Sequence, residues 1–166
     1  MSGHSRAHDE VGLTLALLIR GKLGVRAPCR VHQAGLQVRV EAAEASFYPD
    51  LHVTCDARDH AHPSVTRYSS LIIEILSPST RDYDRGDKFS AYKCLDSLRE
   101  YLLVDSQTQA VSLSRRVAAG RWLTLDVDPT ESFELETIGL TLSVTEIYSE
   151  TDVPLPRPRP RSVPAE

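Results

Sequence analysis

The spacing of apolar positions changes several times along the first half of the chain. From about residue 7 to residue 23 the apolar positions follow helical spacing, and Gly21 and Gly24 supply a stop. Apolar residues then alternate with polar ones over 36–40 and again over 48–55, which predicts strands with one face on the core. The short β-branched run 71–76 is apolar at all but one position and predicts a buried strand.

The second half of the chain predicts one more helix and several short strands. A helix is expected from about residue 84 to residue 98, followed by a strand over 101–105 that runs parallel to 71–76. Antiparallel strands are expected at 111–115 and 122–127, short strands near 133 and 140, and a helical turn within 143–150. This order predicts an α/β fold, with a central mixed sheet flanked by helices and additional antiparallel strands.

One acidic residue interrupts the most apolar strand. Glu74 lies within Leu-Ile-Ile-Glu-Ile-Leu, and charged side chains are rarely buried unless they are paired or bind a metal. Asp50 follows Pro49 at the start of a predicted strand, and Lys88 lies on the next predicted helix. Two carboxylates and a lysine on neighbouring elements can form a magnesium-dependent hydrolytic site, because Mg²⁺ prefers oxygen ligands and activates bound water.

Composition narrows the class of protein without deciding its function. The 166 residues are 41% hydrophobic and 25% charged, which is typical of one soluble domain, here placed at 1–150. A Pro/Arg-rich segment over 151–166 is expected to be a flexible tail. No apolar stretch of 18 residues and no secretory leader is evident, so we expect a cytoplasmic protein without a membrane span.

Charge and cysteine content add two further expectations. The net charge of −4 argues mildly against broad non-specific nucleic-acid binding but does not exclude a nuclease. Cys29, Cys55 and Cys94 are widely spaced and form no C-x-x-C pair, so neither a zinc site nor a disulfide framework is predicted. We expect all three cysteines to be buried, reduced thiols.

A string of residues around the candidate site resembles a known family. Tyr48-Pro49-Asp50 is followed by the sequence Glu-Ile-Leu-Ser-Pro-Ser-Thr from Glu74, then by Asp-Arg-Gly-Asp-Lys ending at Lys88, and by Tyr92. This combination, within a similarity that runs from about residue 8 to residue 148, resembles the Uma-two family. That family is grouped with the PD-(D/E)XK nuclease superfamily.

The resemblance implies a restriction-endonuclease-like core that hydrolyses DNA with Mg²⁺ or Mn²⁺. Asp50 and Glu74 would be metal ligands, and the Ile75 carbonyl is a further candidate ligand. The lysine that usually stands two residues after the second acid is replaced here by Leu76, and the family pattern implies that Lys88 supplies the amine instead. His8 matches a position that often carries His or an acid, Glu10 is a neighbouring candidate, and Tyr92 is expected to pack beside Lys88.

Each candidate residue also has a structural interpretation. Glu74 could be paired with an Arg or Lys in the core, Asp50 could cap a turn, and Lys88 or His8 could lie on a solvated helix surface. His60 and His62 form an H-x-H pair in a predicted loop without a third ligand, so we expect them to be exposed.

Two other functions stay open. The chain could be a nuclease-derived binding module for nucleic acid or protein that has lost catalysis, as the leucine at position 76 and the acidic net charge suggest. It could also be an interaction domain in which Trp122 and the strands around it form contacts in a homodimer.

Overall fold

A six-stranded mixed sheet forms the centre of the molecule in the computed structural model, which describes residues 5–25 and 29–157. The strand order is β1-β4-β6-β7-β8-β9, and β6 and β7 are its one parallel pair. The strands are β1 (Arg30–Gln33), β4 (Leu51–Thr54), β6 (Ser69–Leu76), β7 (Glu100–Asp105), β8 (Val111–Arg116) and β9 (Trp122–Val127).

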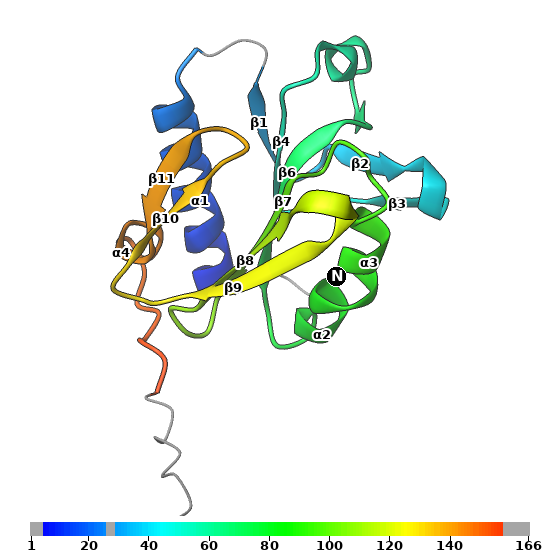
Figure 1. The fold of residues 1–166 in the computed structure, drawn as a ribbon. Helices are drawn as coiled ribbons and strands as arrows, with labels where there is room; N and C mark the ends of the chain where they lie inside the picture. Colours follow the sequence, from blue (N-terminus) through cyan, green and yellow to red (C-terminus); the bar gives the residue numbers. More distant parts are fainter. Residues whose placement is uncertain (1–4, 26–28, 158–166) are drawn as a thin grey trace, which may run out of the picture.

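Helices and two small sheets cover the faces of the central sheet (Figure 1). The helix α1 lies on one face, near the hairpin β10–β11 and α4, whereas α2 and α3 lie on the other. The small sheets are β3-β2-β5 and β10-β11. Their bounds are β2 (Gln37–Val40), β3 (Ala45–Phe47), β5 (Val65–Thr66), β10 (Ser132–Leu135) and β11 (Leu140–Ser143); the helices are α1 (Arg6–Leu23), α2 (Arg81–Arg85), α3 (Asp87–Tyr92) and α4 (Val144–Ile147).

Two apolar cores lie on opposite faces of β6, which confirms the expectation of a buried strand. Ile73 and Ile75 pack with α1, whereas Ile72 and Leu76 pack with Tyr92 of α3. Both sets alternate along one strand because successive side chains point to opposite faces. Glu74 therefore projects from the face that α3 covers.

The predicted helix over 84–98 is wrong in its bounds. Two short helices, α2 and α3, are separated at Gly86, and α3 ends at Tyr92. Gly86 has φ −103° and ψ −99°, and a Cβ there would lie 3.0 Å from the Asp82 carbonyl oxygen. This close backbone approach favours glycine at the break. It also turns the start of α3 so that Lys88 faces the sheet.

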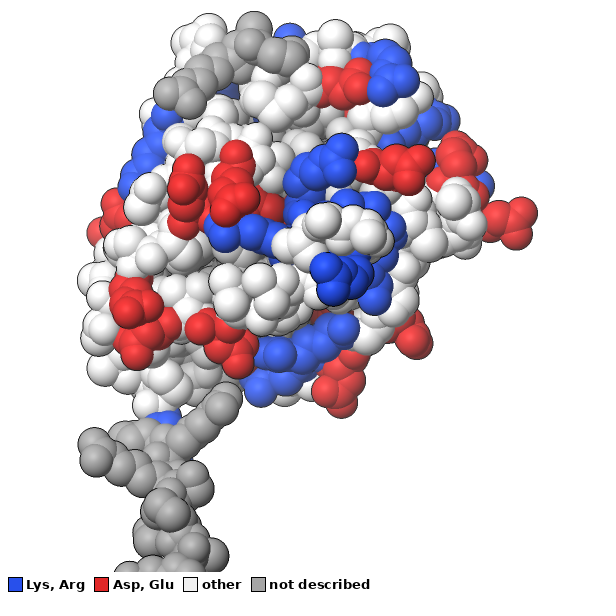
Figure 2. Space-filling model, viewed as in Figure 1, with Lys and Arg blue, Asp and Glu red and all other residues white. Residues whose placement is uncertain are grey.

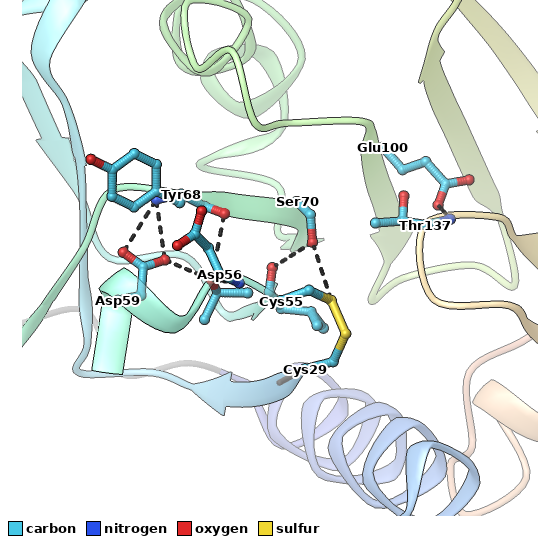
Figure 3. The surroundings of a disulfide bond; sticks show 10 residues. Cys29, Cys55, Asp56, Asp59, Tyr68, Ser70, Glu100 and Thr137 are labelled. Atoms are coloured by element: carbon cyan, nitrogen blue, oxygen red, sulfur yellow. Dashed lines mark hydrogen bonds between the residues drawn. A yellow bond between two sulfur atoms is a disulfide. The ribbon is translucent and has the colours of Figure 1, made fainter. Parts of the chain in front are cut away.

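The expectation of three reduced, buried cysteines is wrong. Cys29 and Cys55 form a disulfide (Figure 3). Cys94 is exposed and free. The register of β1 against β4 pairs Arg30 with Thr54, so the two cysteines lie opposite each other just beyond the ladder. Their 26-residue separation in sequence gave no sign of this, because the pairing depends on two strands meeting in space.

Replacing Cys29 and Cys55 together by serine is expected to lower the free energy of unfolding by about 3 kcal/mol, because the disulfide restricts the unfolded chain. Urea unfolding of parent and variant without reductant measures the difference. Cys94→Ser, an exposed change, is the control and is expected to shift stability by less than about 0.5 kcal/mol. Equal stability of the parent and the double variant would contradict the disulfide.

The first residues of the predicted tail are hydrogen-bonded to the domain. Gln109 donates hydrogen bonds to the carbonyls of Val153 and Pro154, so the chain beyond residue 150 stays on the domain for at least these residues. The remainder of the predicted tail, 158–166, lies outside the described residues.

The edge strand β9 was expected to form contacts in a homodimer. Trp122 of this strand packs edge-on against Phe89, and Leu123 and Leu125 are exposed. A homodimer contact there stays a prediction. None of the helices within 5–25 and 29–157 has the length and apolar character needed to cross a membrane.

Candidate active site

Asp50 stands at the end of the antiparallel ladder between β4 and β6. Leu51 pairs with Ile73 and His52 with Ile72, so Asp50 lies just beyond the ladder at the end where Glu74 follows Ile73. The Asp50 charge contributes to the raised pKa of Glu74, so the two carboxylates lie within electrostatic reach of each other. The Asp50 carboxylate also accepts a hydrogen bond of 2.7 Å from the Ile75 backbone amide.

Glu74 is held by two side chains of α3. Lys88 Nζ lies 2.8 Å from Glu74 Oε1, and Tyr92 Oη donates to the same oxygen at 3.2 Å. The Glu74 side chain is only 2% exposed. Both partners lie on one side of α3 because residues four apart in a helix are neighbours on its surface. The helix therefore places a cation and a hydroxyl over the one carboxylate in the central strand.

Lys88 contacts a second carboxylate as well. Its ammonium lies 3.1 Å from Asp84 Oδ1, and the lysine side chain is 12% exposed. Asp84 belongs to α2, on the other side of the break at Gly86, and is itself buried. Lys88 thus bridges Glu74 of the sheet and Asp84 of the preceding helix.

His8 reaches Asp50 from the opposite face of the sheet. The residue lies in the first turn of α1, where the Ser5 hydroxyl caps the helix by accepting from the His8 amide. His8 Nε2 is 3.4 Å from Asp50 Oδ1, and the histidine side chain is 8% exposed. Asp50 is therefore fixed from two directions, by the α1 imidazole and by the Ile75 amide.

The two carboxylates differ in their acidity. Burial raises the pKa of Glu74 to about 8, and attraction to Lys88 offsets only part of this effect. Burial also acts to raise the pKa of Asp50, but hydrogen bonds from His8 and the Ile75 amide outweigh it, so that pKa is lowered. Burial acts to lower the pKa of Lys88, whereas attraction to Glu74 and Asp84 prevails and raises it. The pKa values of the two acids are thus shifted in opposite directions, downwards for Asp50 and upwards for Glu74.

The donor set fits a hard divalent cation. The Asp50 charge contributes to the raised pKa of Glu74, which means that the two carboxylates repel each other and that a shared cation would relieve the repulsion. Among residues 5–25 and 29–157, no group of three or more His, Cys, Asp or Glu side chains is placed to hold a metal. A cation here would need backbone, water or substrate oxygens as additional ligands. Mg²⁺ usually binds to proteins in this way, with few carboxylates and several waters.

Comparison with known proteins identifies the family of this chain. Residues 1–145 match the family profile of Uma2, whose description reads "Putative restriction endonuclease". The chain belongs to the Uma2 family. The family resemblance expected from the motif is thereby confirmed, and the family supports a nuclease-type function.

Relatives and a solved structure agree with the Uma2 assignment. The chain is 34% identical over 148 residues to the uncharacterized protein slr1290 of Synechocystis, covering 89% of this chain and 77% of that protein. It is 29% identical over 126 residues to sll1609 of the same organism, covering 74% and 70%. A crystal structure from Anabaena variabilis, titled "putative nuclease belonging to DUF820", superposes with a TM-score of 0.71 at 18% identity, over 88% of this chain and 82% of that one. This match confirms the restriction-endonuclease-like α/β fold.

The residues selected from the sequence of this Uma2 protein lie in two adjoining sets of contacts. His8 and the Ile75 amide contact Asp50, whereas Lys88 and Tyr92 contact Glu74, the residue before Ile75. The alternative interpretation that Lys88 and His8 lie on a solvated helix surface is therefore wrong. The predicted exposure of His60 and His62 is confirmed.

Asp84, which contacts Lys88, is a residue to which the sequence analysis assigned no role. Its position four residues before Lys88 was a usable signal, because such pairs are neighbours on a helix. Ion pairs at this spacing are common on solvated helix faces, so the spacing alone did not distinguish a buried partner from a surface one.

The surface of this Uma2 protein is mixed in charge on the face drawn in Figure 2. Lys and Arg side chains gather near its centre, and Asp and Glu side chains lie around them, in several places directly beside them. No continuous basic band crosses this face, in keeping with the net charge of −4. Binding of a phosphate backbone here would therefore depend on a few local cations.

Proposed function

We propose that this Uma2 protein is a metal-dependent endonuclease that hydrolyses phosphodiester bonds of DNA. The observation that carries the proposal is the arrangement around Glu74: Lys88 Nζ lies 2.8 Å from its carboxylate, and Asp50 accepts a hydrogen bond from the amide of the next residue, Ile75. The family match and the fold support a nuclease, and this arrangement of two acids and a lysine suits hydrolysis by an activated water.

The oxygens of Asp50 and Glu74 would hold Mg²⁺ or Mn²⁺. The Ile75 amide donates a hydrogen bond to Asp50, and the Ile75 carbonyl would be a further ligand. When bound, the cation would polarise the phosphoryl oxygen and lower the pKa of a coordinated water.

The remaining side chains would orient the reacting groups. The Lys88 ammonium can donate hydrogen bonds to the attacking water or to a phosphoryl oxygen and offset negative charge in the transition state. Tyr92 fixes the orientation of Glu74, and His8 fixes that of Asp50. Such partners of a metal ligand typically contribute tenfold to a hundredfold to affinity or activity.

A binding module without catalysis is the second candidate. Lys88 is engaged by both Glu74 and Asp84, and this buried ion-pair network could serve stability alone. The module would bind nucleic acid or protein without turnover in any divalent ion.

Cleavage of supercoiled plasmid by the full chain distinguishes the two functions. We expect nicked and linear products with Mn²⁺ or Mg²⁺, no products with EDTA, and recovery when metal is added back. Calorimetric titration with Mn²⁺ in the same buffer is expected to show binding. Plasmid that stays intact although Mn²⁺ binds would favour the module, and a silent titration would argue against the metal site altogether.

A further inference from the structure

Lys88 occupies a position in which it competes with the proposed cation. Its ammonium lies 2.8 Å from Glu74 Oε1, an oxygen that also accepts from Tyr92. A divalent cation that takes up Glu74 would place a second positive charge close to this ammonium, and like charges at short distance repel strongly in a buried site. Without another anionic partner, Lys88 would be driven away from the reacting atoms.

Asp84 provides that partner from a fixed position. Its carboxylate lies 3.1 Å from Lys88 Nζ, and its side chain is 4% exposed. The backbone around it is anchored as well: its amide donates to the Thr80 carbonyl at 2.8 Å, and its carbonyl accepts from Tyr101 Oη at 2.9 Å. A buried carboxylate on an anchored backbone keeps its place when its neighbours change partners.

We propose that Asp84 is a positioning residue, which holds the Lys88 ammonium at the site when a divalent cation takes over Glu74. The inference rests on the proposed metal site but assigns a role to a residue outside the acid pair. Lys88 is shared between two carboxylates before the cation binds, and Asp84 alone retains it afterwards.

Asp84→Asn tests this role through metal affinity as well as through activity. Calorimetric titration with Mn²⁺ is expected to give a Kd about tenfold higher than the parent, because Lys88 then pairs with Glu74 alone and is harder to displace. The kcat for plasmid cleavage is expected to fall about a hundredfold, with little change in the KM for DNA. Circular dichroism and thermal unfolding verify the fold of each variant.

Two comparisons separate this role from a general effect of charge. Asp87→Asn removes the same charge from an exposed residue beside Lys88, and its Mn²⁺ affinity and kcat are expected to match the parent. In a Lys88→Met background, Asp84→Asn is expected to leave the Mn²⁺ affinity unchanged, since no ammonium remains to be held. A loss of affinity in that background equal to the loss in the parent would overturn the proposal.

Asp84→Glu keeps the charge and serves if the asparagine variant does not fold. The longer side chain is expected to preserve Mn²⁺ affinity while lowering kcat, because the ammonium is retained but displaced. If Asp84→Asn and Asp84→Glu both have the kcat of the parent, the positioning role is overturned, even where these variants bind Mn²⁺ as the parent does. A parent that binds no Mn²⁺ would instead remove the proposed metal site, and the role of Asp84 with it.

Discussion

Substitution of either acid, as Asp50→Ala or Glu74→Ala, is expected to abolish metal-dependent cleavage of DNA, with a loss of more than about a hundredfold. Each change removes one of only two carboxylates at the proposed cation position. The same variants are expected to lose the rise in thermal unfolding temperature that Mn²⁺ gives the parent, because a ligand stabilises the folded state only to the extent that it binds. Plasmid cleavage and thermal unfolding with and without Mn²⁺ measure the two effects.

Controls are needed because Glu74→Ala also leaves Tyr92 without its buried partner and Lys88 with Asp84 alone. Removing one member of a buried ion pair typically destabilises a protein by about 3–5 kcal/mol. Glu74→Gln keeps the shape and the contact with Tyr92, so a loss of cleavage in this variant isolates the charge. Asp82→Asn, exposed on α2, is the matched control and should cleave normally. If both acid variants cut DNA at the parent rate, the site lies elsewhere.

The central strand and the first helix could be predicted because their patterns are unambiguous. Five of the six residues 71–76 of β6 are apolar, and the single carboxylate among them pointed to the candidate site, since an unpaired buried charge is costly. The α1 residues Val11, Leu15 and Ile19 repeat with helical spacing and are fully buried. In both elements the positions that the local pattern marks as apolar are also the positions that the fold buries.

The strands β1 and β3 could not be predicted, for the opposite reason. Arg30–Gln33 is a polar, half-exposed edge strand, and Ala45–Phe47 has only three residues, so neither shows a clear alternation of apolar and polar positions. The pairing of these segments with β4 and β2 defines them as strands. The disulfide was missed for the same reason, because it depends on where β1 lies.

The leucine at position 76 is explained by the position of Lys88. Leu76 lies on the same face of β6 as Glu74, two residues further on, and it is buried against Tyr92 and its neighbours. A lysine at that position would approach Glu74 from along the strand. Here α3 brings the ammonium to the same carboxylate from above the sheet, and an apolar residue fills the place on the strand.

Mn²⁺ binding is expected to tighten about tenfold per pH unit between pH 6 and pH 8, and to level off above. The raised pKa of Glu74, about 8 because of burial, means that its carboxyl retains a proton below that pH. A cation must displace this proton, so binding releases it and is favoured by higher pH. The lowered pKa of Asp50 keeps that group ionised throughout the range. Calorimetric titrations at half-unit steps measure the slope.

The raised pKa of Glu74 also predicts how the stability of the metal-free protein depends on pH. Its stability is expected to fall as the pH rises, whereas Mn²⁺ affinity is expected to increase. Because the folded-state pKa of Glu74 lies above its ordinary value of 4.5, the folded state binds the proton more tightly than the unfolded state does. This contribution is fully present below about pH 4.5 and is lost as the pH rises through 8. Urea unfolding in EDTA should therefore show stability that falls over this range in the parent and less steeply in Glu74→Gln. The other groups that act on Glu74 are Lys88, Asp84 and Asp50. A slope that is the same in both proteins would assign the pH dependence to groups other than Glu74.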